Sequence, residues 1–215
     1  MQAIRRTLNA ARDVASARVV KQFAVAHHLV YFGAVDYQDD EHQLVRGVTA
    51  SARHQDSHYT VGTANGRDVI VVYRRNRVTY PGHVARDYSW LIMQFDLKRH
   101  DIPRLFIDAK RHDDTFYANL SVMTPKLEDA TAVIVPHEHK FAKAFRILCA
   151  PTDIELATRV LHEQALDMLA SHFKHFDFEL NGDTLFVYAR ASHPQRAVLD
   201  DMLRVGLWLA DHIDA

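Results

Sequence analysis

The sequence predicts an α+β fold in which a long N-terminal helix packs on a mostly antiparallel sheet, with two Asn-Gly hairpins and two C-terminal helices. Three observations predict this class. Apolar residues recur at helical spacing over residues 3–30, and Asn-Gly pairs at 65–66 and 181–182 each separate two runs of strand-forming residues. No helical pattern of roughly 10–15 residues lies between the first strands, as βαβ units would require.

The N-terminal helix follows from one narrow apolar stripe, formed by Ile4, Leu8, Ala11, Ala15 and Val19. The segment is basic, because Asp13 is the one acid among several Lys and Arg residues. A basic face with an apolar stripe could lie on an anionic membrane surface, but Phe23 is its only bulky anchor. We therefore expect the helix to pack on the sheet or on a partner's helix, and to end at Gly33.

The middle of the chain predicts an antiparallel meander. The polar run DYQDDEHQ is a loop, and candidate strands lie at 44–52, 57–64, 67–75, 87–97 and 104–110. Asn65-Gly66 predicts a type I′ turn, because both central residues of that turn need positive φ. Further on, residues 111–130 fit a helix or a loop, 131–136 a short buried strand, and 141–150 a strand, with a helix as the alternative.

The last third predicts two helices around the second hairpin. Thr152 with Glu155, and Ser192 with Gln195, have the spacing of capping boxes. The first box would start a helix that reaches about residue 172, and the second would start the final helix. Between them a strand alternates, with Phe176, Phe178 and Leu180 pointing inward.

The two hairpins share the motif Val-Tyr-x-Arg, but we do not expect a repeat. Asn65 and Val72 are seven positions apart, whereas Asn181 and Val187 are six apart. A one-residue offset sends a strand side chain to the opposite face, so Tyr73 and its counterpart should not be equivalent. We expect a single domain over residues 1–215, with a possible subdivision near 124–137.

Composition excludes several classes of protein. Lys and Arg number 26 against 27 for Asp and Glu, so the chain has no basic excess for binding nucleic acid. Cys149 is the single cysteine, and no signal peptide or transmembrane run is visible. These features predict a soluble, cytoplasmic protein. The chain is histidine-rich, with 15 residues, which we interpret as scattered surface positions.

The sequence offers one candidate metal site, for which a loop that enters a strand is the interpretation we favour, and it offers no catalytic or cofactor-binding set. His137 and His139 at i, i+2 would project from one face of an extended segment, within reach of one metal. His112, Asp113 or Asp114 could approach them in the fold. Zincin, serine-hydrolase and glycine-rich phosphate motifs cannot be placed, and apolar neighbours predict that Cys149 is buried and inert.

A basic and aromatic cluster surrounds the first hairpin. Its members are Arg67, Arg74, Arg75 and Arg77, with Tyr73 and Tyr80 nearby. Such a cluster could bind single-stranded nucleic acid by stacking and phosphate contact. Arginines on an edge strand also discourage edge-to-edge aggregation, and we favour that interpretation.

The C-terminal third resembles an uncharacterised bacterial domain family, a domain of unknown function. The resemblance rests on FAKAFRILCA, ATRVL and FELNGDTLFVYA, which match a Phe-x-x-x-Phe strand, a helix and a hairpin with a central Gly. It implies a bacterial protein. Members often carry N-terminal transmembrane helices, which this sequence lacks, and the family provides no catalytic residues to assign here.

We therefore expect a non-catalytic binding or protein-interaction module of a bacterial cytoplasm. Its partner would be another protein or a second copy of the chain, and an exposed apolar patch or edge strand would distinguish it. The alternative is a metal-dependent hydrolase that uses His137 and His139. A third hypothesis is pH-dependent association through the histidines.

Overall fold

The computed structural model describes residues 2–33, 45, 47–50, 54–78, 85–110 and 127–215, with the backbone alone for 2–12. These residues form helices and a large antiparallel sheet, so the predicted α+β class is confirmed. The chain divides into two compact units. The first comprises residues 1–94 and 189–204, and the second comprises 95–188 and 205–215.

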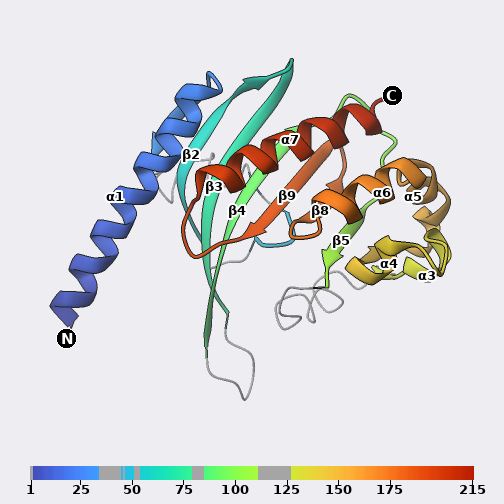
Figure 1. Ribbon diagram of the computed structural model, residues 1–215, viewed down its shortest axis with the longest axis horizontal. Helices are drawn as coiled ribbons and strands as arrows, with labels where there is room; N and C mark the ends of the chain where they lie inside the picture. Colours follow the sequence, from blue (N-terminus) through green and yellow to red (C-terminus); the bar gives the residue numbers. More distant parts are fainter. Residues whose placement is uncertain (1, 34–44, 46, 51–53, 79–84, 111–126) are drawn as a thin grey trace. The chain divides into compact units, whose positions relative to one another are not determined.

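The first unit contains helix α1 and the first strands of the sheet, which follow one another in the order β1-β2-β3-β4 (Figure 1). The elements are α1 (Gln2–Ala26), β1 (Val30–Gly33), β2 (Gln55–Ala64), β3 (Arg67–Val78), most of β4 (Arg86–Asp96) and the first half of α7 (Arg196–Ile213). In the predicted strand at 44–52, the described residues 45 and 47–50 are turn or irregular. That strand prediction is wrong for these residues.

Helix α1 ends earlier than the sequence predicts. His28 has φ 58°, and the amide of Leu29 donates to the carbonyl of Ala24 at 2.8 Å, so a left-handed residue closes the helix. Residues 30–33 then form β1 rather than helix. The prediction failed because FAVAHHLVYF is apolar enough for either state, and no Gly at position 28 marks the left-handed residue.

The buried face of α1 lies one residue further along than the predicted stripe. Ser16, Val20, Phe23 and Ala24 are buried, whereas Ala15 is exposed. On a helix of 3.6 residues per turn, Val20 lies three and four positions before Phe23 and Ala24 and therefore shares their face. That face offers a larger apolar contact than the predicted stripe.

Arg196 fixes α1 against the start of α7. Its Nη1 donates to the carbonyl of Gln22 at 2.9 Å, and its guanidinium lies 5.5 Å from the ring centroid of Phe23. Its Nε also pairs with Asp200 at 2.8 Å, and His27 Nε2 lies 2.9 Å from the same carboxylate. These polar contacts orient a helix whose apolar face is narrow.

In the second unit the strands follow the order β9-β8-β5-β7-β6. They are β5 (Leu105–Ala109), β6 (Glu128–Asp129), β7 (Phe145–Cys149), β8 (Asp177–Asn181) and most of β9 (Thr184–Arg190). The helices are α3 (Thr131–Ile134), α4 (Lys140–Ala144), a 3₁₀ turn at Pro151–Asp153, α5 (Ile154–Val160), α6 (Glu163–His172) and the end of α7. Residues 127–137 belong to this unit.

Two local predictions in this unit are wrong, and the strand predicted at 141–150 is confirmed only for its second half. Residues 131–134 form α3, because the Asp129 carboxylate accepts from both the amide and the hydroxyl of Thr131 and favours a helical turn. The segment 141–150 begins as α4 and becomes β7 at Phe145. The long helix predicted up to residue 172 is interrupted at Leu161, where ψ is 53°.

Neither predicted capping box forms. The Thr152 hydroxyl donates to the Asp153 carboxylate, and α5 has no side-chain hydrogen bond at its N-cap. The Ser192 hydroxyl lies 3.0 Å from His193 Nδ1, while α7 begins at Arg196. The Thr and Ser have the spacing from Glu155 and Gln195 that a capping box requires, but each hydroxyl contacts the side chain of the next residue instead of a helix amide.

The two hairpins differ in their turns. Asn65 and Gly66, with φ 50° and 74°, form the first turn between paired residues 64 and 67. In the second hairpin Asn181 pairs with Thr184, so the turn residues are Gly182 and Asp183. After the first turn β3 begins at Arg67, so Tyr73 lies six residues further on. After the second turn β9 begins at Thr184, so Tyr188 lies four residues further on. The two tyrosines are therefore offset by two residues, whereas the sequence predicted an offset of one residue.

A substitution at Gly206 tests the close packing of α7 in the second unit. A Cβ at this position would lie 2.0 Å from Cε2 of the buried Phe95 ring. Gly→Ala in an open helix interior stabilises by about 1 kcal/mol, but we expect Gly206→Ala to destabilise by about 1–3 kcal/mol. Urea unfolding measures the sign.

Ala197, exposed on the same helix, provides the control. Because Ala197 is the second residue of α7, Ala197→Gly should lower the free energy of unfolding by less than the roughly 1 kcal/mol of a helix interior, through helix propensity alone. A stabilised Gly206→Ala variant would contradict the close approach.

Candidate functional site

The structure describes two of the predicted metal ligands, His137 and His139. His139 is the N-cap residue of α4, where its Nδ1 accepts from the amide of Phe141 at 3.1 Å. Its Nε2 lies 3.3 Å from Asp167, which also pairs with Lys140. His137 lines a separate cavity of about 950 Å³. Among the residues described, no three His, Cys, Asp or Glu side chains could hold a metal ion, and residues 112–114 lie outside them.

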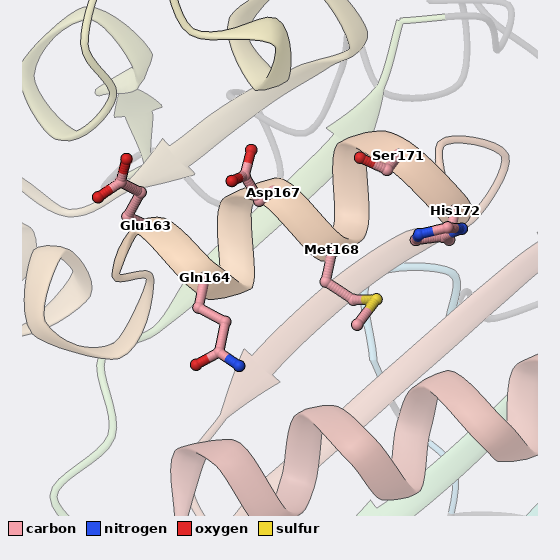
Figure 2. A pocket seen from close by; sticks show the side chains of 6 residues that line it. All are labelled: Glu163, Gln164, Asp167, Met168, Ser171 and His172. Atoms are coloured by element: carbon pink, nitrogen blue, oxygen red, sulfur yellow. The ribbon is translucent and has the colours of Figure 1, made fainter.

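A shallow groove beside Asp167 follows a single helix. Figure 2 shows that its six labelled side chains all come from α6, and that Glu163 and Asp167 point away from Gln164 and Met168. Lys140 and His139 hold the carboxylate of Asp167 and lower its pKa, with the hydrogen bond from Lys140 as the main favourable cause. Side chains that diverge in this way do not build a site for a small ligand.

Cys149 is buried in β7, as its apolar neighbours predict. Burial raises the pKa of its thiol to about 11. The thiol is therefore protonated at neutral pH, which makes it a poor nucleophile.

The predicted arginine cluster does not form one surface. Arg67 and Arg74 are buried, whereas Arg75 and Arg77 are exposed. Arg75 and Arg77 alternate with buried residues along β3, so they share one face of that strand with Tyr73. Tyr80 lies outside the described residues. The cluster therefore divides into a structural pair and an accessible pair.

Arg74 is the centre of a buried polar network. Its Nε and Nη2 donate to the two carboxylate oxygens of Asp56 at 2.8 and 2.7 Å, and both side chains are fully buried. Arg74 also donates to the hydroxyl of Thr49 and to the carbonyl of Val45. The hydroxyl of Tyr59 donates to the same carboxylate. This network joins β2, β3 and the turn at residues 47–50.

His58 lies beside this network at a β-bulge. Ser57 pairs with Tyr73 and Thr60 pairs with Val71, so two residues of β2, His58 and Tyr59, lie opposite a single residue of β3. His58 has φ 59°. The hydroxyl of Tyr31 lies 2.9 Å from Nδ1, whereas the buried Nε2 has no hydrogen-bond partner among the described residues. Burial lowers the pKa of His58; Asp13 opposes this shift and Arg75 adds to it.

An apolar patch covers the outer part of β1, β2 and β3. Val30 pairs directly with Val61, and Val61 with Ile70, so the three side chains form a cross-strand row. Phe32, two residues along β1, lies where the register with β2 shifts. Val30 is 55% exposed and Phe32 60%, while Val61 and Ile70 are half-buried. We call these four residues the edge patch, because β1 is the last strand on this side of the sheet.

A polar cavity of about 600 Å³ lies on the opposite face of the same strands, where α1 packs. Strands β3 and β4 provide its floor, α1 contributes Ser16 as one wall, and the segment before α7 contributes the other. The hydroxyl of Tyr73 donates to the carbonyl of Ser192 at 2.7 Å and joins floor to wall. The full lining is Ser16, Gln55, Tyr73, Arg75, Asn76, Arg77, Asp87, Tyr88, Ser89, Ser192 and His193.

Comparison with known proteins identifies a shared fold. No family model matches this chain, and no curated protein matches it. Among solved structures the chain is similar to the mycobacterial trehalose monomycolate transport factor A, TtfA. The TM-score is 0.65, with 12% sequence identity over 92% of this chain and 93% of that chain. At that identity the likeness shows the fold alone.

None of the described helices is both long enough and apolar enough to cross a bilayer.

The Arg74–Asp56 pair is testable by a double-mutant cycle. Removing one partner of a buried pair leaves an uncompensated charge, so Arg74→Met should lower the free energy of unfolding by about 3–5 kcal/mol. Asp56→Leu combined with Arg74→Met should cost less than the sum of the two single changes.

The exposed pair Arg159–Glu155 is the matched control, since its side chains are 68% and 86% exposed. Arg159→Met should cost about 0–1 kcal/mol. Equal costs for Arg74→Met and Arg159→Met would show that the buried network is not stabilising.

His58 makes stability depend on pH. Because its folded-state pKa lies below the usual 6.5, the unfolded chain binds more protons below that pH, and stability should fall as the solution is acidified. His212, whose pKa burial also lowers, contributes in the same direction. His58→Asn, which tolerates the left-handed backbone, should lose less stability than wild type between about pH 7.5 and about pH 5.5.

Denaturation midpoints at the two pH values measure this difference. The exposed His193 serves as control, and His193→Asn should behave as wild type. An unchanged pH dependence in His58→Asn would show that His58 is not responsible.

Proposed function

We propose that this chain is a non-catalytic protein-interaction module that acts in a bacterial cytoplasm and binds its partner through the edge patch. The observation that carries the proposal is an exposed Val on the terminal strand β1, in a cross-strand row with half-buried Val61 and Ile70, together with an exposed Phe two residues along the same strand. Exposed apolar residues that are contiguous and lie on a sheet edge are typical of contact surfaces.

The patch offers a meaningful driving force. Full burial of one Val or Phe side chain contributes roughly 1.5–3 kcal/mol, so Val30 and Phe32 together could supply several kcal/mol before the costs of association. Strand β1 is only four residues long and its register with β2 shifts after Tyr31. Short, irregular edges limit uncontrolled pairing, which favours one specific contact over open-ended aggregation.

The occupant that we infer is a second copy of this chain. β1 carries no charged residue, so two copies can approach without repulsion between like charges. Antiparallel pairing of β1 with β1 about a two-fold axis is self-complementary, because each copy presents the same residues to the other. The row of β-branched side chains would continue across such an interface.

The geometry at His139 bears on the choice between the two hypotheses. The hydrolase alternative has no specific observation in its favour, because Nδ1 of His139 already accepts from the α4 backbone. We also propose that the C-terminal third belongs to the bacterial family that it resembles.

The edge patch is testable by sedimentation velocity over a hundredfold range of protein concentration. The wild-type chain should shift from monomer to dimer as its concentration rises. Val30→Ser combined with Phe32→Ser should weaken dimerisation at least tenfold, because it removes the exposed apolar side chains.

Val133, 69% exposed in α3, provides the matched control, and Val133→Ser should associate as wild type does. A strictly monomeric wild-type chain would overturn the second copy as occupant. In that case, photo-crosslinking from position 32 in cells, compared with position 133, distinguishes a different protein partner from no partner.

A further inference from the structure

The polar cavity of the first unit has no part in the edge-patch proposal, since it lies on the other face of β2 and β3. Several of its side chains are polar but well buried: Ser16 is 5% exposed, Tyr73 2%, Asn76 3% and Tyr88 3%. Burying polar groups costs free energy unless they have partners. Tyr73 donates to the carbonyl of Ser192 and Asn76 to that of Thr49, so these two groups already have partners inside the unit. A cavity lined with such groups is suited to a polar ligand.

The volume fits a small molecule. Pockets for small ligands measure roughly 300–1,000 Å³, and this one is about 600 Å³. Its boundaries come from three separate parts of the sequence, namely α1, the β2–β4 strands and residues 192–193. A hydrogen bond from Tyr73 to Ser192 and an ion pair from Arg75 to Asp13 connect these parts. The cavity is therefore a built feature of the first unit.

Two arginines lie at its rim, and each is ion-paired with one carboxylate, Arg75 with Asp13 and Arg77 with Asp87. Arg75 and Arg77 are 51% and 70% exposed, and Asp87 is the one carboxylate in the lining. Arg77 Nε lies 3.8 Å from Asp87, too far for a hydrogen bond, so its guanidinium can turn toward a ligand. His193, also in the lining, adds a donor.

Arg75 is held in place for recognition. Its Nη2 donates to Asp13 at 3.0 Å, and its guanidinium lies 5.4 Å from the ring centroid of Tyr73. Stacking and ion pairing at one end leave the other donors of the planar group directed outward. Two guanidinium groups two residues apart on one strand face match the several oxygens of a phosphate, which arginine binds in bidentate fashion.

The remaining lining groups suit hydroxyls. Ser16, Ser89 and Ser192 provide hydroxyl groups and Gln55 an amide, all able to donate or accept hydrogen bonds. Tyr73 and Tyr88 add aromatic surface. We infer that the cavity binds a small phosphorylated molecule that carries hydroxyl groups, with its phosphate on Arg75 and Arg77. Such chemistry occurs in free sugar or polyol phosphates and in phospholipid headgroups.

Isothermal titration of the full chain with glycerol 3-phosphate, and separately with inorganic phosphate, tests the inference. Saturable one-to-one binding is expected, tighter for glycerol 3-phosphate because the serines contact its hydroxyls. Arg75→Gln combined with Arg77→Gln should weaken binding at least tenfold, and added salt should weaken it too.

The matched control is Arg159→Gln combined with Arg204→Gln, which removes the same charge from two exposed arginines elsewhere. It should bind as wild type does, and so should the Phe32→Ser variant. Ser89→Leu, which fills the cavity without changing charge, should also abolish binding. Equal losses in the two double-arginine variants, or no binding of either phosphate probe or of the vesicles described next, would overturn the inference.

Vesicles distinguish the two sources of the ligand. Phosphatidylglycerol vesicles present the same glycerol phosphate group at a surface, and phosphatidylcholine vesicles provide the control. Co-sedimentation with the former that depends on Arg75 and Arg77 indicates a lipid headgroup. Binding of glycerol 3-phosphate without co-sedimentation indicates a free metabolite.

Discussion

The buried ion pair between Arg74 and Asp56 is the constraint on which the first unit depends. Two charges removed from water require a nearly complete set of hydrogen bonds, and here Thr49, Val45 and Tyr59 complete the set. That requirement fixes the register of β2 against β3 at positions 55–57 and 73–75 and holds the turn at residues 47–50 against them. Beyond the bulge at His58 and Tyr59 the register shifts by one residue, and there the cross-strand pairs Val30–Val61 and Val61–Ile70 align the edge patch. Arg74 and Arg75 alternate along β3, so the buried contact lies on one face of the strand and the cavity floor on the other.

Much of the fold could be predicted from local patterns. The α+β class, the Asn65-Gly66 turn and the burial of Cys149 each depend on a few adjacent residues, so the sequence alone indicates them. The wrong predictions at residues 28, 131, 152 and 192 share one cause. A local backbone conformation or hydrogen-bond partner decides the structure there, and the periodicity of apolar residues carries no information about it. His28 ends α1 in a left-handed conformation usually given to Gly, and Asp129 turns the β-branched run at Thr131 into a helix. In both capping boxes the serine or threonine hydroxyl contacts the side chain of the next residue instead of a helix amide.

The candidate sites were harder to foresee, because they join residues distant in the sequence. The arginine cluster of the first hairpin was visible, but adjacent members have opposite roles: Arg74 is buried against a carboxylate 18 positions away, and Arg75 faces the cavity. Strand alternation separates the two, yet only the position of Asp56 shows which arginine is inside. The edge patch likewise depends on the cross-strand pairing of Val30, Val61 and Ile70, and the segment of Val30 was predicted as helix.

The division into two units has a consequence for synthesis on the ribosome. The first unit needs residues 189–204, which are made only after the 94 residues from 95 to 188. At typical elongation rates that interval lasts roughly 5–20 s. During that interval the contacts of Arg196 with α1 have not formed, and residues 192–193, which make the second wall of the cavity, have not been synthesised. The apolar strands β1–β3 have already been synthesised. The nascent chain is thus at its most aggregation-prone before its last helix emerges, and chaperones that hold exposed strands would act in that interval.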